Sequence, residues 1–560
     1  MATIADQLLA KLDTQQRAIA AHLHGPVAVL AGAGTGKTRT ITHRIAYGVH
    51  TGEYAPENVL SISYTRRAAG ELQARLGQLG VSGVAARTIH SAALEQCNSF
   101  WESAVGGRRP EIYSAKLPIL EQIFEERGSS AAPGMLAEVA SEIEWRKVSV
   151  LSLETYADLL PQRDLPPGVS GDLMLQLMQD YEEFKIRRGI LDLEDMLAFV
   201  SGMIESDESV ARAVRERYRF LTVDEYQDVS PLQHSLIRTW LGDNENLCVV
   251  GDASQTIYSF SGAQQRFLLD FMREFPAATQ YRLEQNYRST PEIVRVANTL
   301  MRDQPGALQL RAAKKHGEEV AAAWFPTVKR EYQAVADDIS AALQNGENPA
   351  QIAVLARTRA QLHEISQYLH TRSIATQQHR GDEMRFFNRA EIRQAVLQLK
   401  AFADTGINRP IFQVVSDVLR NCGWTPQEPA NMADREKWLG FQALLQLVDE
   451  TGAENVQQLA EQLLQLSLAQ YEPEIAAVTL IPVHSAKGLE WDRVYVVGMT
   501  EGLLPVAQAI SADLVDEERR LAYVAFTRAR HVLRLSGSAE GRREPSRFLR
   551  EAQVRTIQVS

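Results

Sequence analysis

Short apolar runs that end in small or acidic residues recur along the chain and predict buried strands. They lie at residues 26–30 (PVAVL), 59–63 (VLSIS), 220–223 (FLTV), 247–250 (LCVV), 352–355 (IAVL) and 494–497 (VYVV). Strands that are buried on both faces of a parallel sheet read as continuous apolar runs. Helical patterns with interspersed charge lie between these runs, so we expect an α/β protein with two parallel sheets.

Two long stretches lack the strand pattern and read as helical. Residues 91–200 carry an amphipathic run at 173–187, and residues 394–470 carry such runs at 438–447 and 456–466. Each stretch interrupts an α/β pattern, which predicts an inserted helical domain. Prolines and a glycine at 161–170 (PQRDLPPGVS) predict a loop. The expected division is a first α/β domain at 1–91 and 201–280, an insert at 92–200, a second α/β domain at 281–393 and 471–560, and a shorter insert at 394–470.

Composition excludes some classes of protein. The chain of 560 residues is too long for one hydrophobic core, and its charged fraction of 23% is ordinary for a globular protein. The net charge of −11 provides no general attraction for a polyanion, so nucleic-acid binding would need a local basic track. The widely spaced Cys97, Cys248 and Cys422 cannot form a zinc or iron–sulfur cluster, and we expect reduced thiols in a cytoplasmic protein. We expect neither a signal peptide nor a membrane span.

A glycine-rich segment, AGAGTGKT at 31–38, follows the first predicted strand. Gly34 and Gly36 allow the backbone N–H groups to surround phosphates, and the following helix directs its positive N-terminus at the same anion. Lys37 would lie between the β- and γ-phosphates, and Thr38 would offer a hydroxyl to Mg²⁺. Ala31 stands where the strict motif has glycine, at a position that only ends the strand. The segment predicts an ATP site with Mg²⁺.

An acidic pair follows the third predicted strand, in TVDEYQD at 222–228. Asp224 would hold Mg²⁺, and Glu225 would polarise the attacking water. Acidic residues at strand ends are common, but after a phosphate-binding loop the pair becomes specific. Cleavage also needs positive charge at the γ-phosphate, for which Arg288 in LEQNYRST and Arg528 in AFTRAR are candidates.

In chain order, these four motifs and five others resemble those of superfamily 1A helicases, the UvrD/Rep/PcrA family. The matching segments are LDTQQRA, AGAGTGKT, SYTRRAAGEL, TIHS, VDEYQD, VVGDASQTIYSFSGA, LEQNYRS, VHSAKGLEWD and EERRLAYVAFTRA, and they span almost the whole chain. GLEWD, the ending PSRFL and the reduced second insert resemble most the second UvrD-like helicase of actinobacteria, without its C-terminal four-cysteine segment and HRDC domain.

The resemblance implies two RecA-like motor domains of the P-loop NTPase class, with ATP and Mg²⁺ in the cleft between them. Gln16 would read the adenine edge, Tyr287 would stack on adenine and Glu490 would bind the ribose. Gln255 would sense the γ-phosphate and Arg528 would be the arginine finger. The expected catalytic residues are Lys37, Glu225, Gln255, Arg288 and Arg528, and the expected nucleotide contacts also include Ala31, Gly32, Ala33, Gly34, Thr35, Gly36, Thr38 and Arg39.

A motor that moves along any sequence should stack on bases and track phosphates without reading base edges. The alternating Tyr258 and Phe260 suit base stacking. The resemblance adds Tyr64, Thr65, His90 and His484 as strand contacts, and Arg66, Arg67, Arg357 and Arg359 would supply charge for phosphates. Core packing is the alternative for Tyr64 and Phe260. These contacts tolerate DNA and RNA alike, and the resemblance favours DNA.

The expected function is an ATP-dependent 3′→5′ single-stranded DNA translocase and DNA helicase. Its partners would be single strands and 3′-tailed or forked duplexes, with protein partners unidentified, in a bacterial cytoplasm at the nucleoid. The processes would be DNA repair, replication or recombination. An ATP-switched adaptor is the alternative, which the presence of Glu225 and Arg528 disfavours. A helicase–nuclease of the RecB or AdnB type would need more than the 31 residues that follow position 529.

Several departures from the family pattern affect DNA handling more than ATP hydrolysis. Phe260 and Ser261 stand where the family usually has tryptophan and arginine, and Pro482 stands where it has threonine or serine. The second insert, at 77 residues, is shorter than usual in the family. These departures therefore favour translocation over processive unwinding.

Overall fold

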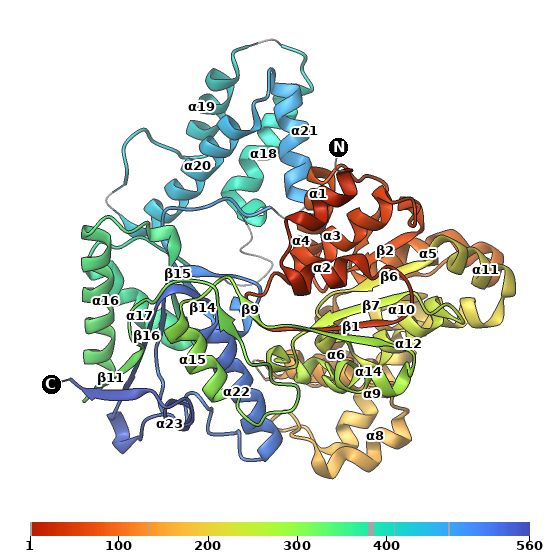
Figure 1. The fold of residues 1–560 in the computed structure, drawn as a ribbon, viewed down its shortest axis with the longest axis horizontal. Coiled ribbons are helices and arrows are strands. Elements are labelled where there is room, and N and C mark those ends of the chain that lie inside the picture. Colours follow the sequence, from red (N-terminus) through yellow and green to blue (C-terminus); the bar gives the residue numbers. More distant parts are fainter. Residues whose placement is uncertain are drawn as a thin grey trace. The chain divides into compact units, whose positions relative to one another are not determined.

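The apolar runs predicted as strands form two parallel sheets in the computed structural model, which describes residues 3–559 except 133, 379–385, 408, 430, 469 and 470. The chain divides into two units (Figure 1). Unit 1 comprises Met1–Ala31 and Gly36–Leu283, and unit 2 comprises Gly32–Thr35 and Glu284–Ser560. The predicted α/β class is confirmed.

Within the described residues, unit 1 contains a six-stranded sheet of order β3-β2-β6-β7-β1-β8, and neighbouring strands pair in parallel. Its strands are β1 (Val27–Ala31), β2 (Val59–Ile62), β3 (Ala85–Arg87), β6 (Phe220–Val223), β7 (Leu247–Gly251) and β8 (Thr279–Leu283). In β1, β2, β6 and β7 every residue is buried, as the continuous apolar runs predict.

Helices follow the strands of unit 1 and begin at clear N-terminal signals. Thr65 and Thr88 cap α4 and α5 through their side-chain oxygens, and Gly36, with φ of 80°, precedes α3. The helices are α1 (Ile4–Ala10), α2 (Thr14–Ala21), α3 (Lys37–His50), α4 (Arg66–Gln78), α5 (Ile89–Ala104), α10 (Leu193–Ser206), α11 (Glu208–Arg217), α12 (Pro231–Leu241), α13 (Arg266–Leu269) and α14 (Phe271–Glu274).

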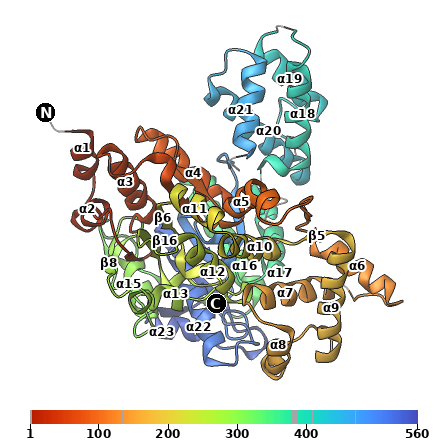
Figure 2. The ribbon, with the colours of Figure 1, turned by 90° about the vertical axis from the view of Figure 1, so that its right-hand side faces the viewer.

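The first insert is mostly helical and has its own apolar core, in which Ile119, Ile143, Leu177 and Tyr181 are buried. Its helices lie together in Figure 2 and are α6 (Lys116–Glu126), α7 (Met135–Val148), α8 (Leu153–Leu159) and α9 (Gly171–Arg188). A short parallel pair, β4 (Glu111–Ile112) and β5 (Ile190–Leu191), interrupts the stretch predicted as wholly helical. The expected insert boundaries at 92 and 200 fall inside α5 and α10, which pack against each other.

In the part of the chain that the structure describes, unit 2 contains a seven-stranded sheet of order β13-β14-β12-β15-β16-β11-β17, also paired in parallel. The strands are β11 (Ala321–Phe325), β12 (Ile352–Ala356), β13 (Thr376–Gln378), β14 (Val478–Pro482), β15 (Trp491–Val496), β16 (Ala529–Ser538) and β17 (Arg555–Gln558). A separate short pair is formed by β9 (Gln285–Asn286) and β10 (Arg311–Ala312).

The second insert is a helical bundle whose core includes Phe386, Ile392, Phe441 and Leu459 (Figures 1 and 2). It consists of α18 (Ala390–Ala403), α19 (Ile411–Asn421), α20 (Met432–Thr451) and α21 (Val456–Leu468). The other helices of unit 2 are α15 (Pro291–Leu300), α16 (Val328–Gln344), α17 (Arg359–Thr371), α22 (Ala512–Phe526) and α23 (Arg547–Glu551). The expected start at 394 falls inside α18, and the expected end at 470 lies outside the described residues.

The cysteines are free thiols: Cys97 and Cys248 are buried and Cys422 is partly buried. Burial raises the pKa of each thiol, which keeps it protonated and unreactive. Among the helices described, none combines the length and the apolar character needed to cross a membrane.

Candidate functional site

The glycine-rich loop leaves β1 at Ala31 and enters α3 at Lys37. Gly34 and Gly36 have φ values of 69° and 80°, in the left-handed region that favours glycine. A Cβ at Gly36 would lie 2.8 Å from Nε2 of Gln16, so the loop lies directly against that amide. The structure thus confirms the turn that the motif predicts and brings Gln16 to it.

Gln16 is held in place by its own helix terminus. Its backbone N–H donates to Oδ1 of Asp13 at 2.8 Å, and its side-chain oxygen accepts from the Asp13 N–H at 3.4 Å. The side chain is buried beside the loop. This placement suits a residue that recognises a bound base, and the adenine contact stays a prediction.

Lys37 and Glu225 face each other in unit 1. The Lys37 Nζ lies 3.2 Å from Oε1 of Glu225. Burial alone would lower the pKa of Lys37, but Glu225, Asp252 and Asp224 outweigh it and raise that pKa, so the side chain stays an ammonium ion. Glu225 has a φ of 53°, a strained conformation for a residue with a side chain.

A series of hydrogen bonds connects the acidic pair Asp224 and Glu225 to the segment that follows β7. Gln227, in the short helix η3 (Tyr226–Asp228), donates to Glu225 and accepts from the Asp252 backbone N–H at 2.9 Å. Asp252 in turn accepts from Nε2 of Gln255 at 2.7 Å. Burial raises the pKa of Asp252, and the Lys37 charge opposes that rise. The sequence assigned a role to Gln255 but none to Gln227 or Asp252.

In unit 2, Arg288 and Arg530 flank the carboxylate of Glu490. Arg288 Nε donates to one carboxylate oxygen, and Arg530 Nη2 lies 2.9 Å from the other. Burial tends to raise the pKa of Glu490, but Arg288 and Arg530 outweigh it and hold that pKa below its usual range. Arg530, in the RAR segment, is a residue that sequence reasoning missed, and a ribose contact of Glu490 stays a prediction.

The guanidinium of Arg528 is anchored by hydrogen bonds within unit 2. It donates to the carbonyl oxygens of Val524 at 2.9 Å and Leu489 at 3.1 Å, and to Oγ1 of Thr527 at 3.0 Å. These bonds fix its direction. They use three of the five N–H groups of the guanidinium, and the arginine-finger role stays a prediction.

Residues at the end of β9 form hydrogen bonds with the part of the glycine-rich loop that belongs to unit 2. Nδ2 of Asn286 donates to the carbonyl of Ala33 at 2.7 Å, and the Tyr287 N–H donates to the carbonyl of Gly34 at 2.8 Å. Oδ1 of Asn286 also accepts from the Arg288 N–H at 3.0 Å. The Asn286 side chain therefore connects the loop at Ala33 to the backbone of Arg288, a role that the motif LEQNYRS alone did not indicate. The ring of Tyr287 is 43% exposed.

The predicted strand contacts of unit 1 begin at the carboxyl end of β2. Tyr64, Thr65, Arg66 and Arg67 form an exposed run that ends β2 and starts α4. Oγ1 of Thr65 accepts from the Ala68 N–H at 3.1 Å, so its contact with a strand would be made from a helix cap. Two arginines beside the positive end of a helix form a local basic surface in an acidic protein.

Aromatic rings lie beside this run. The ring of Tyr64 stacks on Tyr258 with centroids 5.4 Å apart and planes 10° apart. Phe260, in η5 (Ser259–Ser261), meets Tyr258 edge-on at 6.1 Å. Phe260 is 58% exposed, which excludes core packing as the reason for its ring. Tyr64 is 42% exposed, but burial raises the pKa of its hydroxyl, so that end of the side chain is enclosed. The structure therefore brings together Tyr258 and Phe260, which were predicted to stack on bases, and Tyr64, which was predicted to contact the strand.

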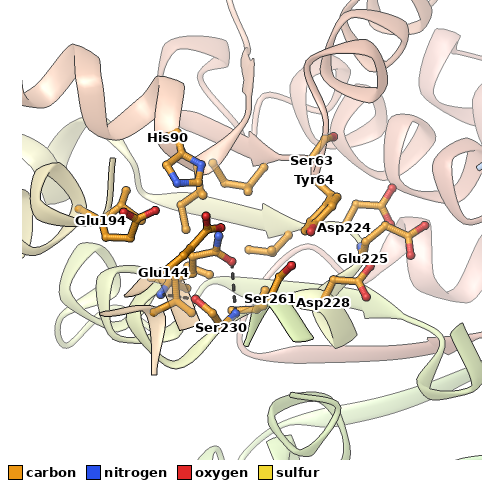
Figure 3. A pocket seen from close by; sticks show the side chains of 18 residues that line it. Ser63, Tyr64, His90, Glu144, Glu194, Asp224, Glu225, Asp228, Ser230 and Ser261 are labelled. Atoms are coloured by element: carbon orange, nitrogen blue, oxygen red, sulfur yellow. Dashed lines mark hydrogen bonds between the residues drawn. The ribbon is translucent and has the colours of Figure 1, made fainter. Parts of the chain in front are cut away.

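A cavity of about 270 Å³ lies between this surface and the acidic pair (Figure 3). Glu144 of α7 in the helical insert and Glu194 of α10 face it from one side, and Asp224 and Asp228, which follow β6, face it from the other. Burial raises the pKa of Glu194 to about 7, with Asp192 adding to the rise and Lys116 opposing it. These carboxylates give the cavity a negative lining that would repel phosphates.

The remaining predicted strand contacts differ in their surroundings. His90, at the start of α5, has its pKa lowered to about 4 by burial, with Lys116 and Arg66 adding to the effect. In unit 2, burial and then Arg357 lower the pKa of His484 to about 4. Arg357 itself pairs with Glu518 through Nε at 3.0 Å and Nη2 at 2.8 Å. Its guanidinium is thus already paired with a carboxylate, whereas Arg359 is exposed.

Family models match most of the chain. The UvrD/REP helicase N-terminal domain matches residues 12–276, and the UvrD-like helicase C-terminal domain matches residues 281–428 and 409–540. The chain is 39% identical to the ATP-dependent DNA helicase UvrD2 of Mycobacterium tuberculosis (strain ATCC 25618 / H37Rv), over 98% of this chain and 82% of that protein. The chain belongs to the UvrD/Rep helicase family.

More distant members of the family are also similar over nearly the full chain. DNA helicase II of Escherichia coli (strain K12) is 28% identical over 97% of this chain and 88% of its own length. ATP-dependent DNA helicase PcrA of Staphylococcus aureus (strain NCTC 8325 / PS 47) is 26% identical over 97% of this chain and 86% of its own length. The predicted family is confirmed, as is its special likeness to the second UvrD-like helicase of actinobacteria.

Proposed function

We propose that this chain is an ATP-dependent 3′→5′ single-stranded DNA translocase and DNA helicase. One observation carries the proposal: nucleotide-handling and strand-stacking residues follow the carboxyl ends of neighbouring parallel strands in one sheet. Lys37 follows β1, Tyr64 follows β2, Glu225 follows β6 and Tyr258 follows β7. Ligands of parallel α/β sheets bind at this edge. ATP cleavage and strand binding can therefore influence each other through short connections.

The residues present in unit 1 fit a nucleotide with Mg²⁺. The left-handed Gly34 and Gly36 leave the loop backbone open to phosphates, and Lys37 remains charged. Thr38 and Asp224 are the oxygen donors that would hold Mg²⁺, a hard cation that would neutralise charge on the phosphates when bound. Glu225 would orient and polarise the attacking water, and Gln255 would respond to the γ-phosphate. The Arg39 guanidinium donates to the Lys11 carbonyl at 2.7 Å, so a nucleotide contact would come from its other N–H groups.

Residues of unit 2 would complete hydrolysis. Arg288 and Arg528 would stabilise negative charge at the γ-phosphate, Tyr287 would stack on adenine and Glu490 would bind the ribose. The Glu490 carboxylate is already ionised between Arg288 and Arg530. A nucleotide that draws Arg288 away from Glu490 would therefore be exchanging one ion pair for another, which lowers the cost of the movement.

The strand would be held by stacking and by phosphate contacts. Tyr258 and Phe260 present exposed or half-exposed rings to bases, with Tyr64 supporting Tyr258. Arg66 and Arg67 supply charge at the helix start. The substrates would be single strands and 3′-tailed or forked duplex DNA, in the cytoplasm of a bacterium at its nucleoid. Repair, replication or recombination of DNA would be the process served.

Stimulation of ATP hydrolysis by single-stranded DNA tests this proposal. We expect the rate of ATP hydrolysis to increase at least about tenfold when poly(dT) is added, since a translocase hydrolyses ATP as it steps along DNA. The same reaction with poly(U) separates DNA from RNA. Hydrolysis that no nucleic acid alters would contradict the proposal and favour the ATP-switched adaptor.

A further inference from the structure

We propose that Gln227 is a positioning residue that couples the carboxylate of Glu225 to the strand-binding segment after β7. The inference rests on the proposed function and adds to it a residue that neither the motif reading nor the family assignment gave a role. Gln227 is fully buried in η3, between the acidic pair and the end of β7. Its amide has partners on both sides.

The two ends of the Gln227 amide bind different motifs. Nε2 donates to Oε2 of Glu225 at 2.5 Å and lies 3.3 Å from Oδ2 of Asp228. Oε1 accepts the backbone N–H of Asp252 at 2.9 Å. A planar amide that uses both ends cannot move toward one partner without changing the other bond. The position of the Glu225 carboxylate is thereby tied to that of the Asp252 backbone.

The connection continues to the stacking residues. Asp252 begins the short helix η4 (Ala253–Gln255) and accepts from Nε2 of Gln255 at 2.7 Å. Three residues after Gln255 comes Tyr258, which stacks on Tyr64. A base that shifts Tyr258 would therefore move a segment whose first backbone N–H is bonded to Gln227. The chain of contacts runs from a ring at the strand surface to the carboxylate beside Lys37.

The packing around Gln227 supports a specific fit. A Cβ at Gly251, the last residue of β7, would clash with Oε1 of Gln227 and would lie 2.9 Å from Cδ2 of Leu268. The absence of a side chain at Gly251 is what allows the amide to reach the end of the strand. The space at the end of β7 therefore fits the Gln227 amide only because residue 251 is glycine.

Chemistry explains why an amide suits this position. In the structure Lys37 forms an ion pair with Glu225, and Lys37 would exchange this partner for a phosphate when a nucleotide binds. Gln227 is a neutral donor, so it continues to orient the carboxylate without adding a second positive charge that would weaken it as a base. Replacing Gln227 should therefore reduce the rate of the chemical step far more than nucleotide binding.

The test uses the full chain with Gln227→Met, which keeps the length of the side chain and removes both amide ends. We expect kcat for ATP at saturating poly(dT) to fall about tenfold to a hundredfold, the range that small misplacement of a catalytic group produces. KM for ATP should stay within about threefold, because phosphate contacts are retained. The ratio of DNA-stimulated to basal hydrolysis should fall as well. A Gln227→Met protein with kcat and that ratio both within about twofold of the wild type would overturn the proposal.

Gln96→Met is the matched control, since Gln96 is a buried glutamine of the same unit that accepts from Nε1 of Trp240 at 2.7 Å. It should lower the melting temperature and leave the kcat and the stimulation ratio unchanged. An equal loss of stimulation in Gln96→Met would show a general packing effect and would overturn the proposal.

If Gln227→Met does not fold, Gln227→Glu keeps an acceptor for Asp252 and places a carboxylate against Glu225. That variant should show the same fall in kcat, and wild-type kcat in it would overturn the proposal. Wild-type protein that poly(dT) does not stimulate would instead refute the proposed function itself.

Discussion

Replacement of Phe260 by alanine tests the strand-stacking surface most specifically. The ring is 58% exposed and meets Tyr258 edge-on at 6.1 Å, so little of it supports the core. Stacking of a base on an aromatic ring is worth about 1–3 kcal/mol, which corresponds to a loss of affinity for single-stranded DNA of about 5- to 150-fold. The free energy of unfolding should fall by less than about 1 kcal/mol, as for most exposed positions.

Fluorescence anisotropy with a labelled oligo(dT) would measure the affinity, and ATP hydrolysis as a function of DNA concentration would show the same shift. Basal hydrolysis and KM for ATP should be unchanged. Phe199→Ala is the matched control, because Phe199 is 42% exposed in the same unit but contacts Trp101 instead of the predicted strand surface. Unchanged affinity in Phe260→Ala, or an equal loss in Phe199→Ala, would refute the assignment.

Three further predictions follow from single side chains. Lys37→Ala should reduce hydrolysis at least about a hundredfold, and filter binding should show affinity for single-stranded DNA within about threefold of the wild type, since the stacking residues are intact. Arg357→Ala leaves the Glu518 carboxylate without its bidentate partner, so urea unfolding should show a loss of about 3 kcal/mol, and an unchanged midpoint would contradict the buried pair. The pKa of His90 is lowered from 6.5 to about 4, so the folded state binds fewer protons than the unfolded state within that window. The stability that neutral His90 provides is constant above pH 6.5 and is lost as the pH falls from 6.5 toward 4. His90→Asn should remove this part of the acid destabilisation, which urea titrations of both proteins at several pH values would detect.

Much of the candidate nucleotide site could be located from the sequence because its geometry depends on the spacing of neighbouring residues. The glycine positions, Lys37 and the acidic pair are fixed by the turn between β1 and α3 and by the end of β6. The buried strands of the first sheet were recognisable for a related reason, since continuous apolar runs leave little choice of structure. Strands such as β8, with polar and exposed positions, and β16, with its arginines, carry no such run and were missed.

Contacts between segments far apart in sequence could not be predicted from local pattern. Gln227 gains its partner Asp252 only because β6 and β7 are neighbours in the sheet, and Arg357 gains Glu518 from a helix 161 residues away in sequence. Isolated arginines look alike in a sequence whether they are exposed, as Arg359 is, or paired, as Arg357 is. The boundaries of the two inserts could not be located from the sequence, because α5 and α18 continue across positions 92 and 394 without a turn signal.

Strand displacement from tailed duplexes tests the central claim most directly. One labelled DNA strand is paired to a longer strand that carries either a 3′ or a 5′ single-stranded tail, and release is measured with ATP in excess. We predict release from the 3′-tailed duplex, and none with the Lys37→Ala protein. Release from the 5′-tailed duplex alone would contradict the polarity, and release from neither duplex by a protein whose ATP hydrolysis responds to DNA would contradict helicase activity.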